Sequence, residues 1–306
     1  MTAIQTHTYD VAIIGAGPAG LQAALLLART RKQIIVFDAP QPPRNAASHG
    51  VHNFVGLDGL LPGQIREQAW QQIQVYNSAE LHIEQIVDVQ LTVPDLFTLQ
   101  GENGSTVQAH QVILAVGYQD VYPEIAGFRE CWGQTIIPCP FCDGYENRDR
   151  VWGIAATSEM ALEHLPTLAR NWTARVKVFL ASHLTLNPQQ LETLTAHNID
   201  LHYGDICAIQ HSSGSVEAVT LHTGEQVQVE TLIWRPQEAP TALTRHMINH
   251  LKLELDANGY IKTDEAYQTT LKGLWAVGDV KGWAGALGAA FAANRAATSI
   301  VRGWYL

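Results

Sequence analysis

One stretch near the start of the chain limits its fold more than any other. An apolar, β-branched run at residues 9–14 is followed by Gly-x-Gly-x-x-Gly at 15–20, an Ala- and Leu-rich segment to residue 30, and a second apolar run at 33–37 that leads to Asp38. This order predicts a strand, a tight turn, a helix and a second strand. That arrangement is the βαβ unit that binds an adenine dinucleotide.

Each glycine of this pattern has its own task. Gly15 permits the tight turn, Gly17 lets the backbone approach a pyrophosphate, and Gly20 lets the helix pack on the strand. The helix N-terminus faces the phosphates, and Asp38 can bind a ribose diol. FAD and NAD sites share the motif. The predicted cofactor contacts in this unit are Gly15, Gly17, Pro18, Ala19, Gly20 and Asp38.

A second motif stands near the middle of the chain, where Cys139 and Cys142 are separated by two residues. Such a pair can form a disulfide with little strain, and a helix that begins at Cys142 would lower its thiolate pKa. A zinc site would need a second pair of ligands, but Cys131 and Cys207 stand alone. The motif therefore predicts a redox dithiol and no metal site, with an inert buried pair as the remaining alternative.

Length, charge and cysteine content exclude several classes of function. The 306 residues suffice for two domains, and a formal net charge of −10 argues against nucleic acid as a partner. No apolar run is long enough to span a bilayer, and the first ten residues show no signal peptide, so no membrane association is expected. Four cysteines are too few for a secreted fold held by disulfides, so a cytoplasmic protein is expected.

The long segment 39–63 has no helix or strand pattern. An insert of this length inside a compact domain usually serves a function, so we expect it to lie over the cofactor. His49 and His52 are either polar contacts to a cofactor ring or ordinary loop histidines. The polar residues 1–8 are expected to form a loose arm.

The second half of the chain contains a damaged copy of the nucleotide motif. A strand, turn and helix start at residue 150, with Gly153, Ala155 and Ser158 in the places of the three glycines. Ala155 puts a methyl group where a pyrophosphate needs bare backbone. The next strand ends at residues 181–183, which offer neither an acid for a ribose diol nor arginines for a 2′-phosphate. The pattern predicts a domain that keeps the fold and has lost ordinary nicotinamide binding.

From about residue 241 the pattern returns to the first unit. Residues 273–280 predict a strand that ends at Gly278 and Asp279, and an Ala-rich helix follows. At the carboxyl end of a strand, Asp279 lies where ligand hydroxyls and phosphates meet the protein. A plain turn or N-cap aspartate is the alternative.

Together these motifs resemble those of the low-molecular-weight thioredoxin reductase family of pyridine-nucleotide-disulfide oxidoreductases, over nearly the whole chain. Segments 44–46, 49–50 and 139–146 look closest to the branch that includes fungal dithiol oxidases. The pieces that carry the family resemblance are Gly15-x-Gly17-x-x-Gly20, Ile113-Leu114-Ala115-Val116-Gly117, Cys139-Pro-Phe-Cys142-Asp143-Gly144 and Gly278-Asp279.

The resemblance implies an α/β fold with two Rossmann-like, three-layer ββα domains, the second inserted in the first. It places FAD in a discontinuous domain, residues 1–120 and 241–306, and the dithiol in an inserted domain, residues 121–240. It also implies a homodimer. It extends the expected FAD contacts to Arg44, His49, Asn53, Ala115, Gly117, Gly278, Asp279, Ala286 and Leu287.

The resemblance also implies roles for three residues. Cys139 resembles the interchange thiol that meets the substrate, Cys142 the thiol that pairs with the flavin, and Asp143 the acid/base. The chemistry agrees, because a thiolate is the nucleophile and a neighbouring carboxyl can move the proton that exchange requires. The flavin supplies the two-electron chemistry. The implied substrate is a thioredoxin-like protein or a small dithiol.

The chain departs from the family at the second nucleotide site. NADPH-dependent thioredoxin reductases have an intact Gly-x-Gly-x-x-Ala and a His-Arg-Arg cluster, and this chain has neither. NADPH is therefore not expected to serve as electron donor. Three hypotheses follow: a donor such as ferredoxin, an oxidase in which a substrate dithiol reduces the flavin and oxygen or a quinone reoxidises it, or a different ligand in the inserted domain, such as a second flavin.

Aromatic residues near the C-terminus bear on the last hypothesis. Trp283, Trp304 and Tyr305 could stack on an isoalloxazine where nicotinamide would sit, or they pack within the fold or at a dimer contact. NADPH-dependent thioredoxin reduction is the weaker enzyme alternative. A non-catalytic flavin redox sensor is the alternative of another class, but an intact Cys-x-x-Cys-Asp argues against it.

Overall fold

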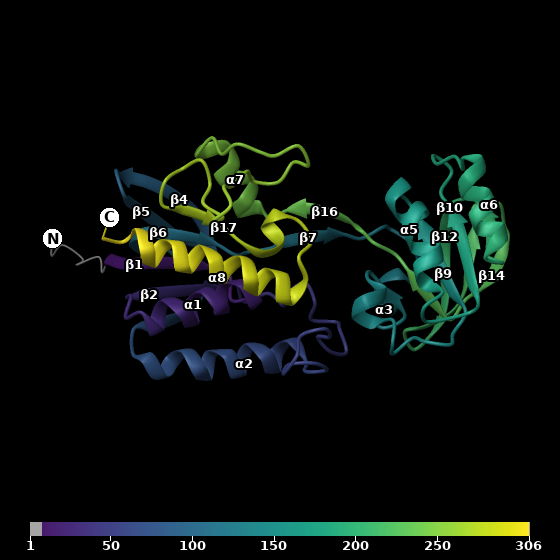
Figure 1. The fold of residues 1–306 in the computed structure, drawn as a ribbon, viewed down its shortest axis with the longest axis horizontal. Coiled ribbons are helices and arrows are strands. Elements are labelled where there is room, and N and C mark those ends of the chain that lie inside the picture. The colour runs from purple at the N-terminus through teal and green to yellow at the C-terminus, as the bar shows by residue number, and fades with distance from the viewer. Residues whose placement is uncertain (1–7, 306) are drawn as a thin grey trace. The chain divides into compact units, whose positions relative to one another are not determined.

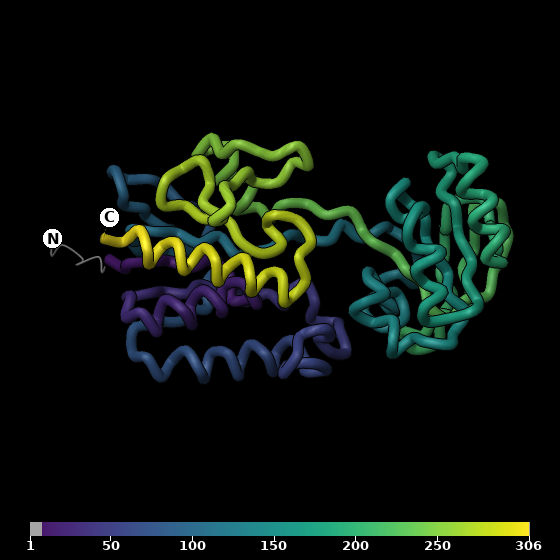
Figure 2. Tube along the Cα trace, in the orientation of Figure 1, coloured from purple at the N-terminus to yellow at the C-terminus, as the bar shows by residue number. Residues whose placement is uncertain are grey.

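The computed structural model describes residues 8–305, which form two compact units. Unit 1 consists of the chain up to Ala46, Leu60–Gln119, and the chain from Glu238 onward, and unit 2 consists of Ala47–Gly59 and Asp120–Gln237. Strands β7 (Tyr118–Val121) and β16 (Gln237–Pro240) pair where the chain passes between the units. Figure 2 traces this path by colour.

Unit 1 is built on one mixed sheet with the strand order β3-β2-β1-β6-β5-β4, and β17 pairs with β6. The pairs β1–β2, β1–β6, β2–β3 and β6–β17 are parallel, as a doubly wound nucleotide-binding sheet requires. The strands are β1 (Thr8–Ile14), β2 (Ile34–Asp38), β3 (Ala79–Ile83), β4 (Ile86–Val93), β5 (Leu96–Gly101), β6 (Thr106–Leu114) and β17 (Leu274–Ala276).

The helices of unit 1 cover this sheet, and α1 and α8 run side by side (Figure 1). Both present buried alanines to the same core, including Ala23 and Ala24 from α1 and Ala293 and Ala296 from α8. Small side chains let two helix backbones approach closely, so composition explains the packing. The helices are α1 (Pro18–Arg29), α2 (Pro62–Ile73), η1 (Gln74–Tyr76), α7 (Ala242–His250), η2 (Gly278–Lys281) and α8 (Gly285–Gly303).

Unit 2 has three layers. A five-stranded parallel sheet, β11-β10-β9-β15-β8, packs on one face against the antiparallel sheet β12-β13-β14 and on the other against α5 and α6. Its elements are α3 (Phe128–Cys131), β8 (Ile136–Ile137), α4 (Pro140–Asp143), β9 (Trp152–Ala156), α5 (Glu159–Ala169), β10 (Val176–Leu180), α6 (Pro188–Ala196), β11 (Asp200–Tyr203), β12 (Ile206–Ser212), β13 (Ser215–Leu221), β14 (Gln226–Gln228) and β15 (Thr231–Ile233).

The fold class predicted from the sequence is confirmed: the chain is α/β with two Rossmann-like sheets. The polar arm predicted at residues 1–8 lies outside the described residues except for Thr8, which begins β1. Within residues 8–305, no helix combines the length and hydrophobicity needed to cross a bilayer.

The structure corrects the sequence interpretation of the second nucleotide motif. Gly153 and Ala155 lie inside β9, and the turn before α5 is Thr157-Ser158. Gly153 is a packing residue, because a Cβ there would lie 2.7 Å from the ring of Phe179. Gly153 therefore holds no place in a phosphate turn, and the turn itself contains no glycine.

The two units divide the chain at 119/120 and 237/238, where 120/121 and 240/241 were predicted. Residues 47–59, expected to lie with the FAD domain, belong to unit 2. A close approach explains this assignment, since a Cβ on Gly133 would lie 2.8 Å from the carbonyl oxygen of Ala47. We call residues 47–59 the 47–59 segment.

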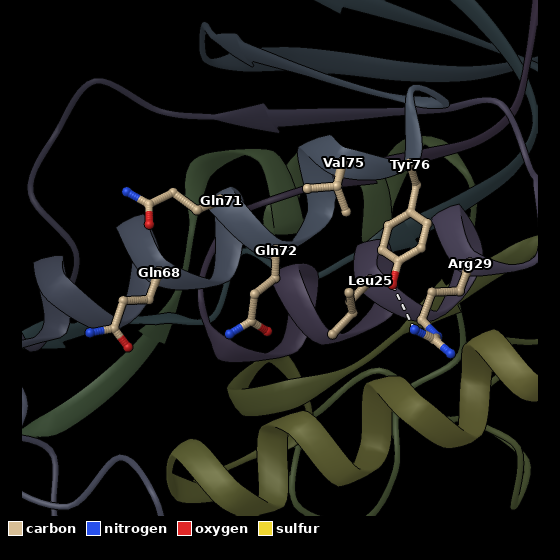
Figure 3. Close-up of a pocket in the computed structure, with 7 residues that line it drawn as sticks. All are labelled: Leu25, Arg29, Gln68, Gln71, Gln72, Val75 and Tyr76. Atoms are coloured by element: carbon tan, nitrogen blue, oxygen red, sulfur yellow. Dashed lines mark hydrogen bonds between the residues drawn. The ribbon is translucent and has the colours of Figure 1, made fainter.

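A groove of about 530 Å³ lies in unit 1, between α1 and the pair α2 and η1 (Figure 3). Arg29 donates a hydrogen bond of 2.6 Å to the hydroxyl of Tyr76 at one end of it. None of the site residues predicted from the sequence lines this groove. The lining residues are Leu25, Arg29, Gln68, Gln71, Gln72, Val75 and Tyr76.

Candidate active site

The glycine turn after β1 leaves space at one glycine and none at the other two. A Cβ on Gly15 would overlap the carbonyl oxygen of Ala115, and a Cβ on Gly20 would overlap that of Gly15. Gly15 also has a φ of +105°, which L side chains rarely adopt. A Cβ on Gly17 would meet no atom within 4 Å. Gly17 is the N-cap of α1, so bare backbone faces open space where a pyrophosphate would bind.

Several predicted cofactor contacts from distant parts of the chain gather around this turn. A Cβ on Gly278 would lie 3.0 Å from the Cβ of Ala19, and one on Gly117 would lie 4.0 Å from the Cβ of Asp279. Pro18 is the first residue of α1. The structure thus brings β6, β17 and the first turn of α1 together. Ala286 and Leu287 lie in the first turn of α8, where Leu287 is exposed.

Asp38 ends β2 and is held from two sides. Its Oδ1 accepts a hydrogen bond of 3.1 Å from the N–H of Ala16, and its Oδ2 pairs with the guanidinium of Arg66 from α2. Burial lowers the pKa of Arg66. The carboxylate therefore lies beside the glycine turn, as a ribose-binding acid should. Sequence reasoning missed Arg66, since nothing in the α2 sequence indicates this partner.

Arg44 joins two parts of unit 1 that are far apart in sequence. Its Nη2 lies 2.8 Å from Glu238 Oε1, and its Nη1 lies 3.4 Å from Asp279 Oδ2. Its guanidinium also lies 4.7 Å from the centre of the Trp283 ring. Asp279 Oδ1 accepts a hydrogen bond of 3.0 Å from the N–H of Ala284, so Asp279 is both a turn residue and an ion-pair partner.

The C-terminal aromatic residues pack within unit 1. The Nζ of Lys32 lies 3.5 Å from the ring centre of Trp304 and 5.2 Å from that of Tyr305. His110 meets Trp304 edge-on at 6.4 Å. These contacts favour the packing alternative for Trp304 and Tyr305 over stacking on a flavin.

The cysteine pair lies at the short helix α4. Cys139 is its N-cap residue and Cys142 its third residue, so the helix begins before Cys142 rather than at it. Both are free, half-buried thiols. The N–H groups of Cys142 and Asp143 bond the carbonyl oxygen of Cys139 at 3.1 and 3.2 Å, which holds the two cysteines on one turn.

The two thiols differ in acidity. The hydrogen bond from the Cys142 thiol, helped by the N–H groups of Cys142 and Phe141, lowers the pKa of Cys139 to about 7. The same hydrogen bond, burial and the charge of Cys139 raise the pKa of Cys142. The pair therefore loses its first proton near neutral pH, with the thiolate on Cys139. A thiolate is the attacking group in disulfide exchange, so this state suits the substrate-facing role that the family resemblance implies for Cys139.

Asp143 follows the pair directly and holds its proton unusually well. Burial, followed by the charge of Glu146, raises the pKa of Asp143 to about 6, while His52 acts in the opposite direction. A carboxyl group that titrates near the working pH can both give and take a proton. This property suits the acid/base role that the family resemblance implies.

The 47–59 segment brings further polar groups to unit 2. Asn53 has a φ of +62°. Its Nδ2 donates a hydrogen bond to the carbonyl oxygen of Phe141, and its backbone N–H donates one of 2.8 Å to Asp58 Oδ1. His49 is exposed. His49 and Asn53 thus belong to the unit that carries the dithiol. Their contact with FAD stays a prediction.

The carboxyl edge of the parallel sheet of unit 2 carries a different set of groups. Ser158 caps α5, since its Oγ accepts a hydrogen bond of 3.2 Å from the N–H of Ala161. Asp205 accepts hydrogen bonds from the N–H and the hydroxyl of Ser182. A pocket of about 200 Å³ opens here. It is lined by Ile125, Ala155, Thr157, Phe179, Ala181, His183, Gly204, Asp205, Ile206 and Trp234.

Asp205 places an acid at the end of β10 that the sequence did not predict there. It follows β11, the neighbour of β10, so only strand pairing brings it to Ser182. Among residues 8–305, no three His, Cys, Asp or Glu side chains are grouped as a metal site would need.

Comparison with known proteins agrees with this geometry. The family model for pyridine nucleotide-disulphide oxidoreductases matches residues 9–151 and 168–297. The chain is 32% identical to the thioredoxin reductase tcpT of Claviceps purpurea, over 90% of this chain and 87% of that protein. The crystal structure of HlmI superposes with a TM-score of 0.90 and 31% identity, covering 98% of this chain and 94% of that one.

The chain belongs to the pyridine nucleotide-disulphide oxidoreductase family. Within that family it is similar to the thioredoxin reductases, among them the putative thioredoxin reductase TrxB of Bacillus anthracis, with a TM-score of 0.89 and 28% identity over 97% of this chain and 98% of that one. The family binds FAD, and the protein is a flavin oxidoreductase that acts on a disulfide. The cradle at Gly17 fits this cofactor.

Proposed function

We propose that the protein exchanges electrons between FAD, the Cys139/Cys142 dithiol and a thioredoxin-like protein or a small dithiol, without NADPH as donor. The observation that supports the chemistry best is the difference between the pKa values of three neighbouring groups. The pKa of Cys139 is lowered to about 7, that of Cys142 is raised, and that of Asp143 is raised to about 6. An inert buried pair would have no such arrangement.

In this proposal FAD is held by unit 1. Bare backbone at Gly17 and the N-terminus of α1 receive the pyrophosphate, and Asp38 receives a ribose. The rest of the FAD molecule would contact the edge of the sheet at Gly117, Gly278 and Asp279. Further contacts would come from Arg44, Ala115, Ala286 and Leu287. FAD supplies the two-electron redox chemistry that no side chain can perform.

The dithiol performs exchange in two balanced steps. The Cys139 thiolate attacks a substrate disulfide, so one S–S bond forms, another breaks, and the departing sulfur takes a proton from Asp143. Cys142 then gives its proton to Asp143 and attacks the Cys139 sulfur. This closes the Cys139–Cys142 disulfide and releases the second substrate sulfur as a thiolate, while Asp143 keeps the proton from Cys142. Substrate oxidation follows the same steps in reverse.

Two features of unit 2 support a donor other than NADPH. The turn before α5 has no glycine, and Ser158 already caps the helix that would receive the pyrophosphate. Asp205 puts a carboxylate at the end of β10, where a 2′-phosphate would bring further negative charge. A reduced ferredoxin or a second flavin in unit 2 would then supply electrons in the reductive direction.

A second candidate function is oxidation of a small apolar dithiol, with oxygen or a quinone as electron acceptor. Exposed apolar side chains in unit 2 favour it. Phe141, between the two cysteines, is 60% exposed, and Tyr145 shortly after them is 65% exposed. Val55 of the 47–59 segment is 96% exposed. Such groups give an apolar dithiol contact area beside the thiols.

The experiment compares two directions with the purified holoenzyme. NADPH with oxidised thioredoxin tests the reductive direction, and a reduced small dithiol under air tests the oxidative one by oxygen uptake. We expect no NADPH consumption above background and oxygen uptake that is lost in Cys142→Ser. Saturable NADPH oxidation would overturn the NADPH part of the proposal. No turnover in either direction, with reduced ferredoxin also failing, would support a sensor.

The flavin content, the oligomeric state and the location of the protein can each be tested. A flavin count near two per chain would support a second flavin in unit 2, and a count near one would remove that hypothesis. The family resemblance supports a homodimer, which sedimentation can test. The low cysteine content supports a cytoplasmic location.

A further inference from the structure

The dithiol loop, residues 139–146, has a neighbour from a distant part of the chain. The 47–59 segment lies in the same unit as the loop, and the Nδ2 of Asn53 donates to the carbonyl oxygen of Phe141, 88 residues further along the chain. The close approach of Gly133 to Ala47 fixes the start of the segment. The segment is therefore anchored at two points within unit 2.

This anchoring places His52 between two carboxylates. Its Nδ1 lies 3.5 Å from Asp58 Oδ2, and its Nε2 lies 3.6 Å from Glu146 Oε1. The N–H of Asn53 binds the other oxygen of Asp58, which fixes that carboxylate in turn. When both ring nitrogens carry a proton, the ring can pair with both carboxylates at once. The His52 side chain is 21% exposed, less than either of its carboxylate partners.

The charged and titratable groups that act on Asp143 come from two segments. Glu146 belongs to the dithiol loop, and His52 belongs to the 47–59 segment. The charge of Asp143 in turn acts to raise the pKa of Cys139 and of Cys142. Glu146 makes the Asp143 carboxylate harder to form, and His52 makes it easier. The two influences are opposite in sign, and the two groups face each other.

We propose that His52 is a positioning residue for the dithiol, which holds Glu146 and offsets its charge so that Asp143 can both release and accept a proton at neutral pH. The inference deepens the proposed function and rests on it for the role of Asp143. The inference gives the 47–59 segment a role at the dithiol, although the sequence analysis assigned this segment to the FAD domain.

The exchange chemistry explains why this balance matters. Asp143 must be protonated when it gives a proton to the departing sulfur, and ionised when it takes the proton of Cys142. A group can do both only if its pKa lies near the working pH. Without the His52 cation, Asp143 holds its proton to higher pH and accepts the second proton less often. Without the Glu146 carboxylate, it releases its proton at lower pH and donates less often.

The test is a ¹³C NMR titration of the Asp143 carboxyl in the reduced holoenzyme, with the resonance assigned by its loss in Asp143→Asn. In His52→Gln the midpoint should rise by about 0.5–1 pH unit, and in Glu146→Gln it should fall by a similar amount. The double variant should titrate close to the wild type. His197→Gln and Glu217→Gln, exposed residues elsewhere in unit 2, are matched controls and should leave the midpoint unchanged.

A rescue variant separates charge from packing. His52→Lys restores a cation without the ring, so its midpoint should return toward the wild-type value. A purely structural role for His52 predicts no such return. An unchanged midpoint in His52→Gln, or a shift in the same direction in both single variants, would overturn the inference.

The readout also distinguishes failure of this inference from failure of the proposed function. The NMR midpoint does not depend on turnover with any substrate. An active enzyme with unmoved midpoints contradicts the inference alone, whereas an inactive protein whose midpoints shift as expected contradicts the proposed function alone. In an active enzyme, the pH profile of exchange should move with the NMR midpoint in each variant.

Discussion

Asp205 and Ser182 are joined by two hydrogen bonds, one from the backbone N–H of Ser182 and one from its hydroxyl, both to the Asp205 carboxylate. The carboxylate of Asp205, which follows β11, therefore binds the residues directly after β10. In a doubly wound sheet this edge is the place where nucleotides bind. The relationship links the fold of unit 2 to the proposed choice of electron donor.

The same pair predicts how stability depends on pH. The hydrogen bonds from Ser182 lower the pKa of Asp205, so its stabilising effect is present above the unfolded pKa of about 4 and is lost as pH falls through the lower folded value. Asp205→Ala should lower the free energy of unfolding at pH 7 by about 1–2 kcal/mol through the lost hydrogen bonds. Urea unfolding at pH 7 and pH 3 measures both effects. An equal loss at the two pH values would contradict this assignment.

Alkylation kinetics should reveal the unequal thiols. The reduced protein should react with iodoacetamide first at Cys139, at a rate that rises with pH around a midpoint near 7. In Cys142→Ser the thiol hydrogen bond changes to one from a hydroxyl, and in Cys142→Ala it is lost, so the midpoint should rise by about one unit in the alanine variant. Mass spectrometry of the labelled peptide identifies the site. First labelling at Cys142 would contradict the assignment of the nucleophile.

Two glycines of the first turn should respond differently to alanine. A methyl group at Gly17 meets no protein atom, so Gly17→Ala should fold with an unchanged melting temperature as apoprotein but bind FAD about tenfold or more weakly, because the methyl enters the pyrophosphate space. At Gly20 the methyl meets the carbonyl of Gly15, so Gly20→Ala should cost about 1–3 kcal/mol of stability even without FAD. Flavin fluorescence titration and thermal unfolding measure these effects. Equal FAD affinity in Gly17→Ala and the wild type would contradict the proposed cradle.

The sequence predicted what depends on local pattern. A continuous apolar, β-branched run, three glycines and an Ala-rich segment predict the strand, glycine turn and helix, and the structure has them as β1 and α1. Asp279 was expected near this turn because it ends a strand, and the family resemblance implied Ala115 and Gly278. The structure brings all three to the same edge of the sheet.

Local sequence patterns did not predict the features that depend on contacts between distant parts of the chain. Gly153 resembled a turn glycine, but the ring of Phe179 from β10 requires a glycine inside β9. The 47–59 segment lies with the dithiol because of contacts to Gly133 and Phe141, which no local pattern encodes. Asp205 reaches Ser182 only through strand pairing.

The most direct test of the central claim is an anaerobic titration of the flavin absorbance of the holoenzyme, first with NADPH and then with a reduced dithiol. We expect NADPH to leave the flavin oxidised, and we expect the dithiol to bleach it in the wild type but not in Cys142→Ser. Rapid bleaching by NADPH would contradict the proposed function, because unit 2 would then serve as an ordinary nicotinamide domain.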